Sequence, residues 1–259
     1  MKRIVLIFTL TLMVLTASVA MAKDWGKVRI GVEGAYPPFS YVTPGGELAG
    51  FDIDIAKALG KAMGAEVTLV PQDWDGIIPA LLAKKYDAII ASMSVTEERK
   101  KKVAFTNKYY QTPAKFIVKK GAIGDFSREA IKGKNIGVQR ATIHDKYLTD
   151  NYGKEVSIKR YGSQDEAYLD LTAGRVDMLL ADSVALSDGF LKKPEGKDYQ
   201  FIGPDLNDPK WFGDGAGIAI RKEDTDLVEK FNNAIDQIRS DGTYKTIQDK
   251  YFDFNVYGE

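Results

Sequence analysis

Arg99 is the residue of this sequence best suited to hold a carboxylate. It comes after Ser94-Val95-Thr96-Glu97, which has the S-x-x-E form of a capping box and stands where an apolar segment gives way to a charged one. A helix start offers free N–H groups and a positive dipole end to an anion. The planar guanidinium of Arg99 can add a bidentate pair, which lysine cannot reproduce. The alternative interpretation is an ordinary helix cap beside a surface arginine.

Two carboxylates follow apolar segments that have the character of buried strands. Asp182 ends the segment 176–182, where a carboxylate either caps the next helix together with Ser183 or meets a cation. Glu33 follows the segment 28–32 and is either a surface loop residue or a second partner for a cation. The residue types leave both interpretations open at each position.

Aromatic residues are close in sequence to these polar ones. Tyr36 and Phe39 flank two prolines, and Trp74 stands between two aspartates. Rings in such loops either cover a core or form a binding platform. A pair of rings beside Glu33 would suit a guanidinium or ammonium group, through stacking and a cation–π attraction of roughly 0.5 to 2 kcal/mol.

Several kinds of chemistry lack the residues they need. His144 is the only histidine and there is no cysteine, so we expect no metal site, no cofactor and no histidine-based catalytic triad. The glycine-rich segment 213–217 lacks G-x-G-x-x-G spacing, which favours a turn and hinge over a nucleotide loop. The 36 basic and 36 acidic residues cancel, and without a basic stripe we expect no nucleic-acid partner.

Two pairs of similar segments indicate how these residues are positioned. Residues 28–36 (VRIGVEGAY) resemble 134–142 (KNIGVQRAT), and residues 84–92 (KKYDAIIAS) resemble 174–182 (GRVDMLLAD). Each first segment looks like a buried strand that runs into a loop, and each second one ends a helix and enters a short apolar strand. Because both pairs occur in the same order, the sequence predicts two lobes of the same construction.

Helical periodicity between these segments predicts the class of fold. Apolar residues recur with helical spacing in 51–63 and in 164–173. Strands that alternate with helices imply βαβ units and mainly parallel sheets. In such sheets ligands bind off the carboxyl ends of the strands. That rule selects residues on two facing edges that make one cleft: 33–36, 92–94, 139–142 and 182.

The first 22 residues have the features of a cleaved signal peptide. Two basic residues precede an uncharged apolar run that is shorter than the ~20 residues a spanning helix needs, and Ala20-Met21-Ala22 fits the cleavage pattern. We therefore expect a mature chain that begins at Lys23. No later run has membrane length, and no cysteine is present for lipid attachment, so we expect a protein released into the periplasm.

Six motifs together resemble the periplasmic polar amino-acid-binding proteins of ABC importers, in particular the lysine/arginine/ornithine- and histidine-binding type. They are EGAYPPF (33–39), GFDIDI (50–55), YDAI (86–89), SMSVTEER (92–99), DLTAGR (170–175) and DGTY (241–244). The resemblance runs from about Lys27 to Gly258. It implies an α/β protein with the two-lobed periplasmic-binding-protein (type II) fold, in which each lobe has a mainly parallel sheet flanked by helices.

The same resemblance implies where the lobes begin and end. The first lobe would comprise residues 23–110 and 216–259, and the second lobe residues 115–206. Two hinge strands, at 111–114 and 207–215, would join the lobes and let them close on a ligand.

The resemblance also implies a role for each matching residue. Arg99 would grip the α-carboxylate of the ligand, helped by the main-chain N–H groups of Ser94 and Thr142. Asp182 would meet the α-ammonium group, together with the carbonyl of Ser92 and the hydroxyl of Ser94.

Residues around the ligand side chain follow in the same way. Tyr36 and Trp74 would be its two aromatic walls, and Glu33 stands where binders of basic amino acids place an acid. Gln139 and His144 are expected as polar contacts at its distal end. Met93, which lies inside the S-M-S-V motif, is included among the ligand-binding residues.

This sequence departs from the family pattern in the second lobe. Ala141-Thr142 stands where Gly-Thr or Gly-Ser is usual, and Ile143 follows it. Arg140 would place a positive charge near a cationic ligand unless it points outward. Arg140 and Ile143 therefore bear on which ligand side chain the site prefers.

The implied function is that of the periplasmic substrate-binding component of an ABC amino-acid importer. We expect a monomer that binds a basic amino acid, arginine first and then lysine, ornithine or histidine, and delivers it to an inner-membrane permease. One alternative is an opine or glutamine in the same clamp. Another, from a different class, is a periplasmic dehydratase-like enzyme, in which Glu33 or Asp182 would have to act as acid or base.

Overall fold

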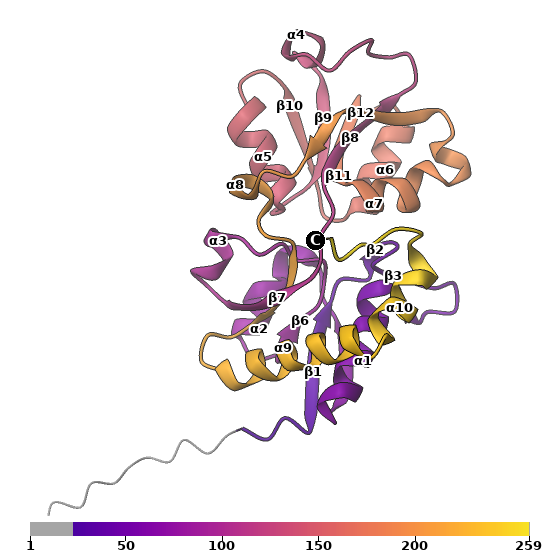
Figure 1. The fold of residues 1–259 in the computed structure, drawn as a ribbon. Helices are drawn as coiled ribbons and strands as arrows, with labels where there is room; N and C mark the ends of the chain where they lie inside the picture. Colours follow the sequence, from indigo (N-terminus) through magenta and orange to yellow (C-terminus); the bar gives the residue numbers. More distant parts are fainter. Residues whose placement is uncertain (1–22, 259) are drawn as a thin grey trace, which may run out of the picture.

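The computed structural model describes residues 23–258, which form two lobes joined by crossing segments (Figure 1). The expected signal peptide, residues 1–22, and Glu259 at the end of the expected first lobe lie outside the described residues. Within 23–258, no helix combines the length and the apolar character that crossing a membrane requires.

The first lobe, at the bottom of Figure 1, is built on a five-stranded sheet with helices on both faces. Its strands are β1 (Lys27–Val32), β5 (Glu66–Pro71), β6 (Ala88–Ile89), β7 (Ala104–Tyr110) and β13 (Ala216–Ile220), in the order β5-β1-β6-β13-β7. A small sheet contains β2 (Ala35–Tyr36), β3 (Ser40–Val42) and β4 (Leu48–Ala49). The helices are α1 (Phe51–Met63), the 3₁₀ turn η1 (Trp74–Gly76), α2 (Ile77–Leu82), α3 (Glu97–Lys100), α9 (Thr225–Ser240) and α10 (Thr243–Tyr251).

The second lobe repeats this plan. Its strands are β8 (Ala114–Lys119), β9 (Asn135–Gln139), β10 (Ser157–Tyr161), β11 (Met178–Asp182) and β12 (Tyr199–Leu206), in the order β10-β9-β11-β8-β12. The helical segments are α4 (Arg128–Ile131), α5 (Ile143–Tyr152), α6 (Gln164–Thr172), α7 (Ser183–Leu186), η2 (Ser187–Leu191), η3 (Pro194–Gly196) and α8 (Pro209–Phe212).

The two-lobed α/β architecture is the one that the sequence predicted, and each mainly parallel sheet contains one reversed strand, β13 in the first lobe and β8 in the second. β1 runs parallel to β5 and β6, whereas β13 runs antiparallel to β6 and β7. In the second lobe β9 runs parallel to β10 and β11, and β8 antiparallel to β11 and β12. The reason is topological, because a strand that leaves a lobe through a crossing and a strand that returns by the other crossing must run in opposite directions.

Gly31 and Gly137 show why the two similar strand segments carry a glycine at the same place. A Cβ atom at Gly31 would lie 2.6 Å from the ring of Tyr86, and one at Gly137 would lie 2.4 Å from the side chain of Leu179. Each glycine therefore lets a neighbouring side chain pack directly on the strand. β1 and β9 occupy the same place in sheets of the same order, so the internal repeat read from the sequence is confirmed.

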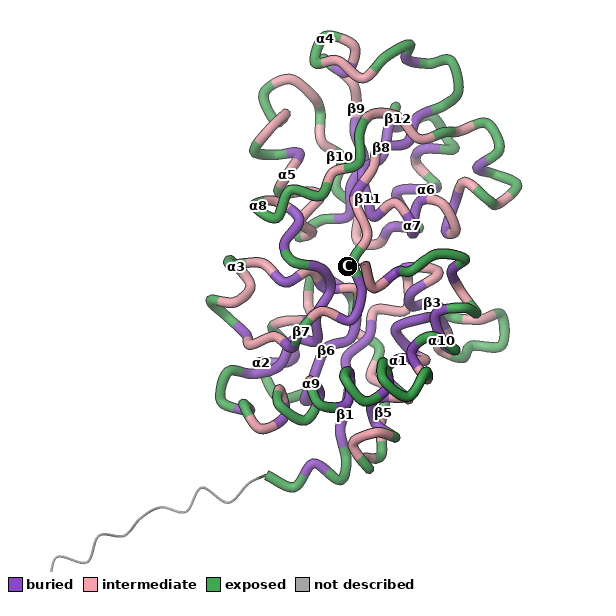
Figure 2. Tube along the Cα trace, in the orientation of Figure 1, coloured by how far each residue is buried: buried purple, intermediate pink, exposed green. Residues whose placement is uncertain are grey.

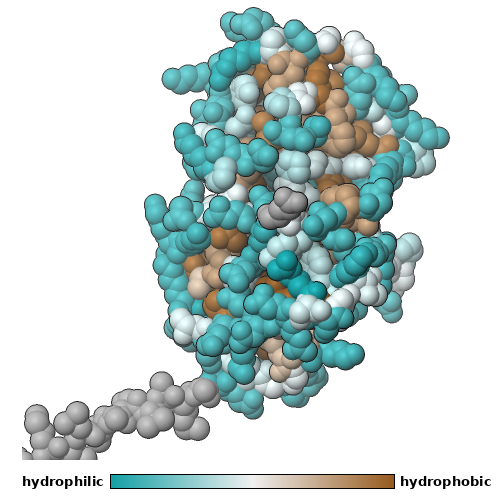
Figure 3. Space-filling model, viewed as in Figure 1, coloured by the Kyte–Doolittle hydropathy of each residue, from teal (hydrophilic) through white to brown (hydrophobic). Residues whose placement is uncertain are grey.

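Helix α1 illustrates how the sequence builds the core. Phe51, Ile55 and Leu59 recur at helical spacing and are fully buried against the sheet and α9, and Gly64 in the left-handed region ends the helix. Figure 2 shows the same distribution throughout both lobes, with buried strands inside and exposed helix faces outside. On the face seen in Figure 3, hydrophilic side chains cover most of both lobes.

The second crossing segment is more than an extended hinge strand. It contains α8, whose Phe212 is buried in the core of the second lobe and lies against Tyr147 of α5 with ring centroids 5.0 Å apart. Residues 209–212 therefore pack as part of the second lobe, and the residues on either side of α8 belong to no helix or strand.

A charged cavity between the two lobes

The strand ends chosen by the sequence rule meet at a cavity between the lobes. Its volume is about 320 Å³, and most of the predicted residues line it. From the first lobe come Glu33, Tyr36, Trp74, Ala91, Ser92, Ser94 and Arg99, and from the second Gln139, Thr142, Ile143 and His144.

A wider cavity of about 980 Å³ adjoins the first and reaches the crossing segments. The two cavities share five lining residues, so they are parts of one cleft: Tyr36, Ser92, Ser94, Ile143 and His144. Asp182 and Thr112 belong to the wider part. Asp182 thus lies in the cleft, away from the narrow part that contains Glu33.

Arg99 brings a cation into the narrow cavity without a carboxylate partner among the described residues. Its Nη1 donates to the carbonyl of Ser94 at 3.0 Å, and the guanidinium lies 5.2 Å from the ring centroid of Trp74. Burial lowers the pKa of Arg99 to about 10, against a weaker opposing effect of Glu98. The guanidinium is therefore shielded from water and keeps donors free for an anion.

Two main-chain N–H groups add to this anion site. The N–H groups of Ser94 and Thr142, which belong to opposite lobes, have no hydrogen-bond acceptor within residues 23–258. The hydroxyl of Thr142 is engaged, since it donates to the carbonyl of Gln139 at 2.7 Å and accepts from the N–H of Asp145 at 3.1 Å. A carboxylate between the lobes could accept from Arg99 and from both N–H groups.

The expected capping box at Ser94 and Glu97 is wrong. Helix α3 has only four residues and its N-cap is Thr96, whose hydroxyl accepts from the N–H of Arg99 at 3.3 Å. Ser94 instead forms an isolated antiparallel bridge with Ala216. So short a helix supplies little dipole, and the anion-binding capacity rests on Arg99 and the free N–H groups.

Glu33 brings an acid to the other part of the narrow cavity. It comes directly after β1, and its Oε1 accepts from the amide of Gln139 in the second lobe. Burial is the main cause that raises the pKa of Glu33 to about 7, opposed by the Gln139 hydrogen bond. No cation of the described chain pairs with this carboxylate, so its ionised form lacks compensation.

Asp182 both caps a helix and presents an acid to the cleft. Its Oδ1 accepts from the N–H groups of Val184 and Ala185 at the start of α7, and Thr112 donates its hydroxyl to Oδ2. Burial nevertheless raises the pKa of Asp182 to about 6. The two interpretations left open by the sequence are thus compatible, because the capping carboxylate still lines the cleft and still lacks a cation.

Asp52 is a buried acid to which sequence reasoning gave no role. It accepts from the hydroxyls of Ser92 at 3.0 Å and Tyr109 at 2.9 Å, and Tyr109 in turn accepts from the N–H of Ser92. Burial raises the pKa of Asp52 to about 7. This cluster holds Ser92, whose φ of 53° is unusual for a residue other than glycine. The only sequence signal was a charge among the apolar residues of 50–55.

The two aromatic walls are fixed by hydrogen bonds across the lobes. Trp74 donates its ring N–H to the carbonyl of Ala141 at 3.2 Å, and the hydroxyl of Tyr36 accepts from the N–H of Asp182 at 3.3 Å. Both rings are at least nine-tenths buried. They therefore have little freedom to lose when a ligand enters.

His144 and Met93 differ in where their side chains lie. His144 lines both parts of the cleft, and burial, with a contribution from the charge of Arg99, lowers its pKa to about 3, so the imidazole is neutral. Met93 is fully buried in a hydrophobic cluster with Trp74 and lines neither part. The assignment of Met93 to the ligand is therefore corrected, because its side chain packs into the core of the first lobe.

Arg140 points out of the cleft, which answers the concern that it might repel a cationic ligand. Its Nε donates to the carboxylate of Asp75 in the first lobe, and both side chains are partly exposed. Neither residue lines the narrow cavity. The pair forms a further connection between the lobes, in addition to the hydrogen bonds of Trp74, Tyr36 and Glu33.

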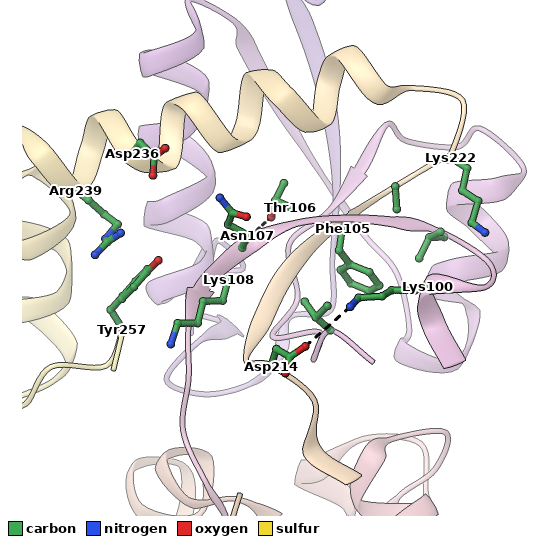
Figure 4. A pocket seen from close by; sticks show the side chains of 13 residues that line it. Lys100, Phe105, Thr106, Asn107, Lys108, Asp214, Lys222, Asp236, Arg239 and Tyr257 are labelled. Atoms are coloured by element: carbon green, nitrogen blue, oxygen red, sulfur yellow. Dashed lines mark hydrogen bonds and ion pairs between the residues drawn. The ribbon is translucent and has the colours of Figure 1, made fainter. Parts of the chain in front are cut away.

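A larger hollow of about 1350 Å³ on the first lobe makes a poorer candidate site (Figure 4). It is lined by β7, part of α9 and the end of the second crossing segment. Lys100 and Asp214 lie 4.0 Å apart across it, and both are exposed to solvent. Exposed pairs of this kind bind weakly, so the charged groups of the narrow cavity offer more to a ligand.

Two α/β lobes that meet at a cavity with uncompensated charges define a two-lobed solute-binding protein. The family model of the bacterial extracellular solute-binding proteins, family 3, matches residues 28–254. The chain therefore belongs to that family.

Known relatives are similar in sequence to this chain over nearly their full length. The L-arginine-binding protein of Pseudomonas aeruginosa is 52% identical over 259 residues, which are 100% of this chain and 99% of that protein. The histidine-binding periplasmic protein of Escherichia coli is 44% identical over 100% of both chains. A solved structure of an ancestral arginine-binding protein bound to glutamine superposes with a TM-score of 0.81 at 36% identity, covering 89% of this chain and 99% of that one.

Proposed function

We propose that this protein binds a basic amino acid, with arginine as its preferred ligand, and delivers it to an ABC permease. The observation that carries the proposal is the charge pattern of the cleft. Arg99 has no carboxylate partner among the described residues, and Glu33 and Asp182 have no cation partner among them. A ligand with one carboxylate and two cationic groups would neutralise all three.

Each group of the ligand has a matching place. The α-carboxylate would accept from Arg99 and from the N–H groups of Ser94 and Thr142, and the α-ammonium would donate toward Asp182. The cationic end of the side chain would lie near Glu33, between rings that favour a flat guanidinium. The L-arginine-binding and histidine-binding relatives support a basic ligand.

Closure would proceed as a population shift. A ligand held by Arg99 of one lobe and Thr142 of the other binds only when the lobes come together, so it stabilises the closed form. We propose a monomer that works in the periplasm, supported by family membership and by relatives that are described as periplasmic.

Glutamine, an opine and catalysis are the competing proposals. A glutamine ligand finds support in the ancestral arginine-binding protein that was solved with glutamine bound. Glutamine, however, would leave Glu33 without a cation. For catalysis, Glu33 and Asp182 have pKa values of about 7 and 6, suitable for an acid or base, but both are better explained as partners of a cationic ligand.

Calorimetric titration of ligand-free protein 23–259 tests the proposal. The ligands would be arginine, lysine, ornithine, histidine, glutamine and octopine, together with two analogues that each lack one group. Agmatine lacks the carboxylate and citrulline lacks the side-chain charge. We expect arginine to bind most tightly and both analogues to lose about tenfold or more in affinity. Equal binding of arginine and citrulline, or binding of glutamine alone, would overturn the proposed ligand.

A further inference from the structure

The amide of Gln139 is fixed in one orientation by two acceptors. Gln139 ends β9 and is only 3% exposed. Its Nε2 lies 2.5 Å from Oε1 of Glu33 and 3.2 Å from the carbonyl of Gly162. Both partners are oxygens that accept, so the amide nitrogen must face them, since the reversed amide would place an oxygen against two oxygens.

This orientation decides what Gln139 can offer a ligand. A carboxamide has two N–H donors, and Glu33 and Gly162 take both. The remaining polar atom is Oε1, which only accepts. Within residues 23–258 nothing donates to Oε1 of Gln139 or to Oε2 of Glu33, and both residues line the narrow cavity. This end of the cavity therefore presents two open acceptors, one from each lobe.

We propose that Gln139 is a specificity-determining residue, which presents its amide oxygen to the ligand and holds Glu33 in position, so that the closed cleft selects a guanidinium over an uncharged isostere. The inference rests on the proposed function and deepens it. A guanidinium has five N–H donors and no acceptor, which matches an end lined by acceptors. The ureido group of citrulline has the same shape, but an oxygen replaces one NH2 group with its two N–H donors, and the group carries no charge.

The location of the pair links this selection to closure. Glu33 belongs to the first lobe and Gln139 to the second, so the two acceptors lie together only when the lobes are closed. In an open form Glu33 would lose the Gln139 hydrogen bond and face solvent. The distal end of the site is thus assembled by the same movement that encloses the ligand.

The test compares Gln139→Met with wild type for arginine and citrulline, by calorimetry. Methionine has a similar volume but neither donates nor accepts as an amide does. We expect arginine affinity to fall by about tenfold and citrulline affinity to change by less than about threefold, so that the preference for arginine shrinks. An arginine-to-citrulline ratio within about twofold of wild type would overturn the role of Gln139.

Two controls separate this outcome from others. Gln237→Met, on the exposed face of α9, makes the same chemical change away from the cleft and should leave both affinities unchanged. In a Glu33→Gln background, Gln139→Met should have a smaller effect on arginine, limited to the loss of the amide oxygen of Gln139, because the carboxylate that Gln139 positions is gone. Should Gln139→Met fail to fold, Gln139→Glu serves instead, since its second carboxylate beside Glu33 should raise the pH at which arginine affinity levels off.

Failure of the proposed function gives a different result from failure of this inference. If wild type itself does not bind arginine, or does not distinguish arginine from citrulline, the proposed ligand is wrong whatever the variants do. If wild type prefers arginine and Gln139→Met keeps that preference in full, the proposed ligand stands and the role of Gln139 is wrong.

Discussion

Two arginines of the first lobe, the partly buried Arg99 and the fully buried Arg221, are paired in opposite ways. Arg221 is 1% exposed, and the described chain satisfies its guanidinium with two aspartates, Asp224 at 2.7 Å and Asp87 at 3.1 Å, and with the carbonyls of Leu81 and Tyr86. Arg99 donates to a single carbonyl and faces a cavity.

The difference distinguishes a structural charge from a binding charge. Arg221 comes directly after β13, away from the cleft, and its network ties the end of that strand to residues that precede β6. Its partners are built into the fold, so its pairing energy contributes to stability. Arg99 is desolvated during folding without an ionic partner, and a ligand carboxylate would supply that partner later. Where the chain leaves a shielded charge unpaired, the missing partner is the best indication of the ligand.

The largest expected effect comes from removing the unpaired charge. Arg99→Met should weaken arginine binding by about 2 to 5 kcal/mol, because the ligand carboxylate loses its ionic partner in a desolvated site. The ligand-free protein should melt at the same temperature or higher, since an uncompensated charge is gone. Calorimetric titration and thermal unfolding measure the two effects. A loss of stability without a loss of affinity would place Arg99 in the same class as Arg221.

The matched variant at the paired arginine should do the reverse. Arg221→Met should lower the free energy of unfolding by about 3 to 5 kcal/mol, because Asp87 and Asp224 are left buried with reduced compensation. Arginine affinity of the folded fraction should not change. Denaturant unfolding and titration at low temperature test this. An unchanged midpoint of unfolding would show that the network contributes little and that the distinction drawn from pairing fails.

Glu33 extends the comparison to an unpaired acid. Its pKa of about 7 in the closed cleft without a ligand should fall when a cation binds, so arginine binding to that form releases a proton below pH 7. Arginine affinity should therefore rise as the pH increases toward about 7 and level off above it. Asp165, Asp73 and Asp52 also act on Glu33 and raise its pKa.

Glu33→Gln isolates this contribution. Because Asp182 and Asp52 also have raised pKa values, some pH dependence should persist in the variant, with the part due to Glu33 missing. Calorimetry in buffers of different ionisation enthalpy counts the protons released. The same release at pH 6.5 in wild type and variant would assign the titration to another group.

The smallest expected effect concerns the exposed pair between Asp75 and Arg140. Removing it with Arg140→Gln should weaken the binding of arginine, lysine and histidine by one common factor, equivalent to about 0.2 to 1 kcal/mol, because it stabilises the closed form without touching the ligand. Added salt should reduce the difference from wild type. Lys146→Gln removes an exposed pair that stays within the second lobe, and provides the control. A change in the ranking of ligands would contradict a role confined to closure.

The fold could be predicted where the pattern is local. Helical spacing predicted α1 and α6, and the repeated Ile-Gly-Val segments predicted corresponding strands in two lobes. The reversed direction of β13 in the first sheet and of β8 in the second could not be predicted from those segments. The direction of each strand is set by the crossings and not by its own residues. The capping box failed for a similar reason, since Ser94 pairs with Ala216 far along the chain.

The site could be predicted where residues stand at strand ends. That rule placed Glu33, Gln139 and Asp182 in the cleft. It missed Asp52, which holds Ser92 by a hydrogen bond, and Thr112, which donates to Asp182. Such contacts join segments distant in sequence. The position of Met93 could not be predicted either, because its side chain packs with Tyr86 and Ala219 in a cluster drawn from separate segments.

The hydrogen bond between Glu33 and Gln139 joins positions that correspond in the two halves of the molecule, the residues after Ile-Gly-Val in 28–36 and 134–142. Ser92 and Asp182 correspond likewise in 84–92 and 174–182. Corresponding positions of the two halves thus line the cleft from both lobes, and identical residues at these positions would accept a linear ligand in either direction. The chain breaks the symmetry at both pairs, with acid opposite amide and hydroxyl opposite acid. Divergence between the two halves therefore gives the site a head and a tail.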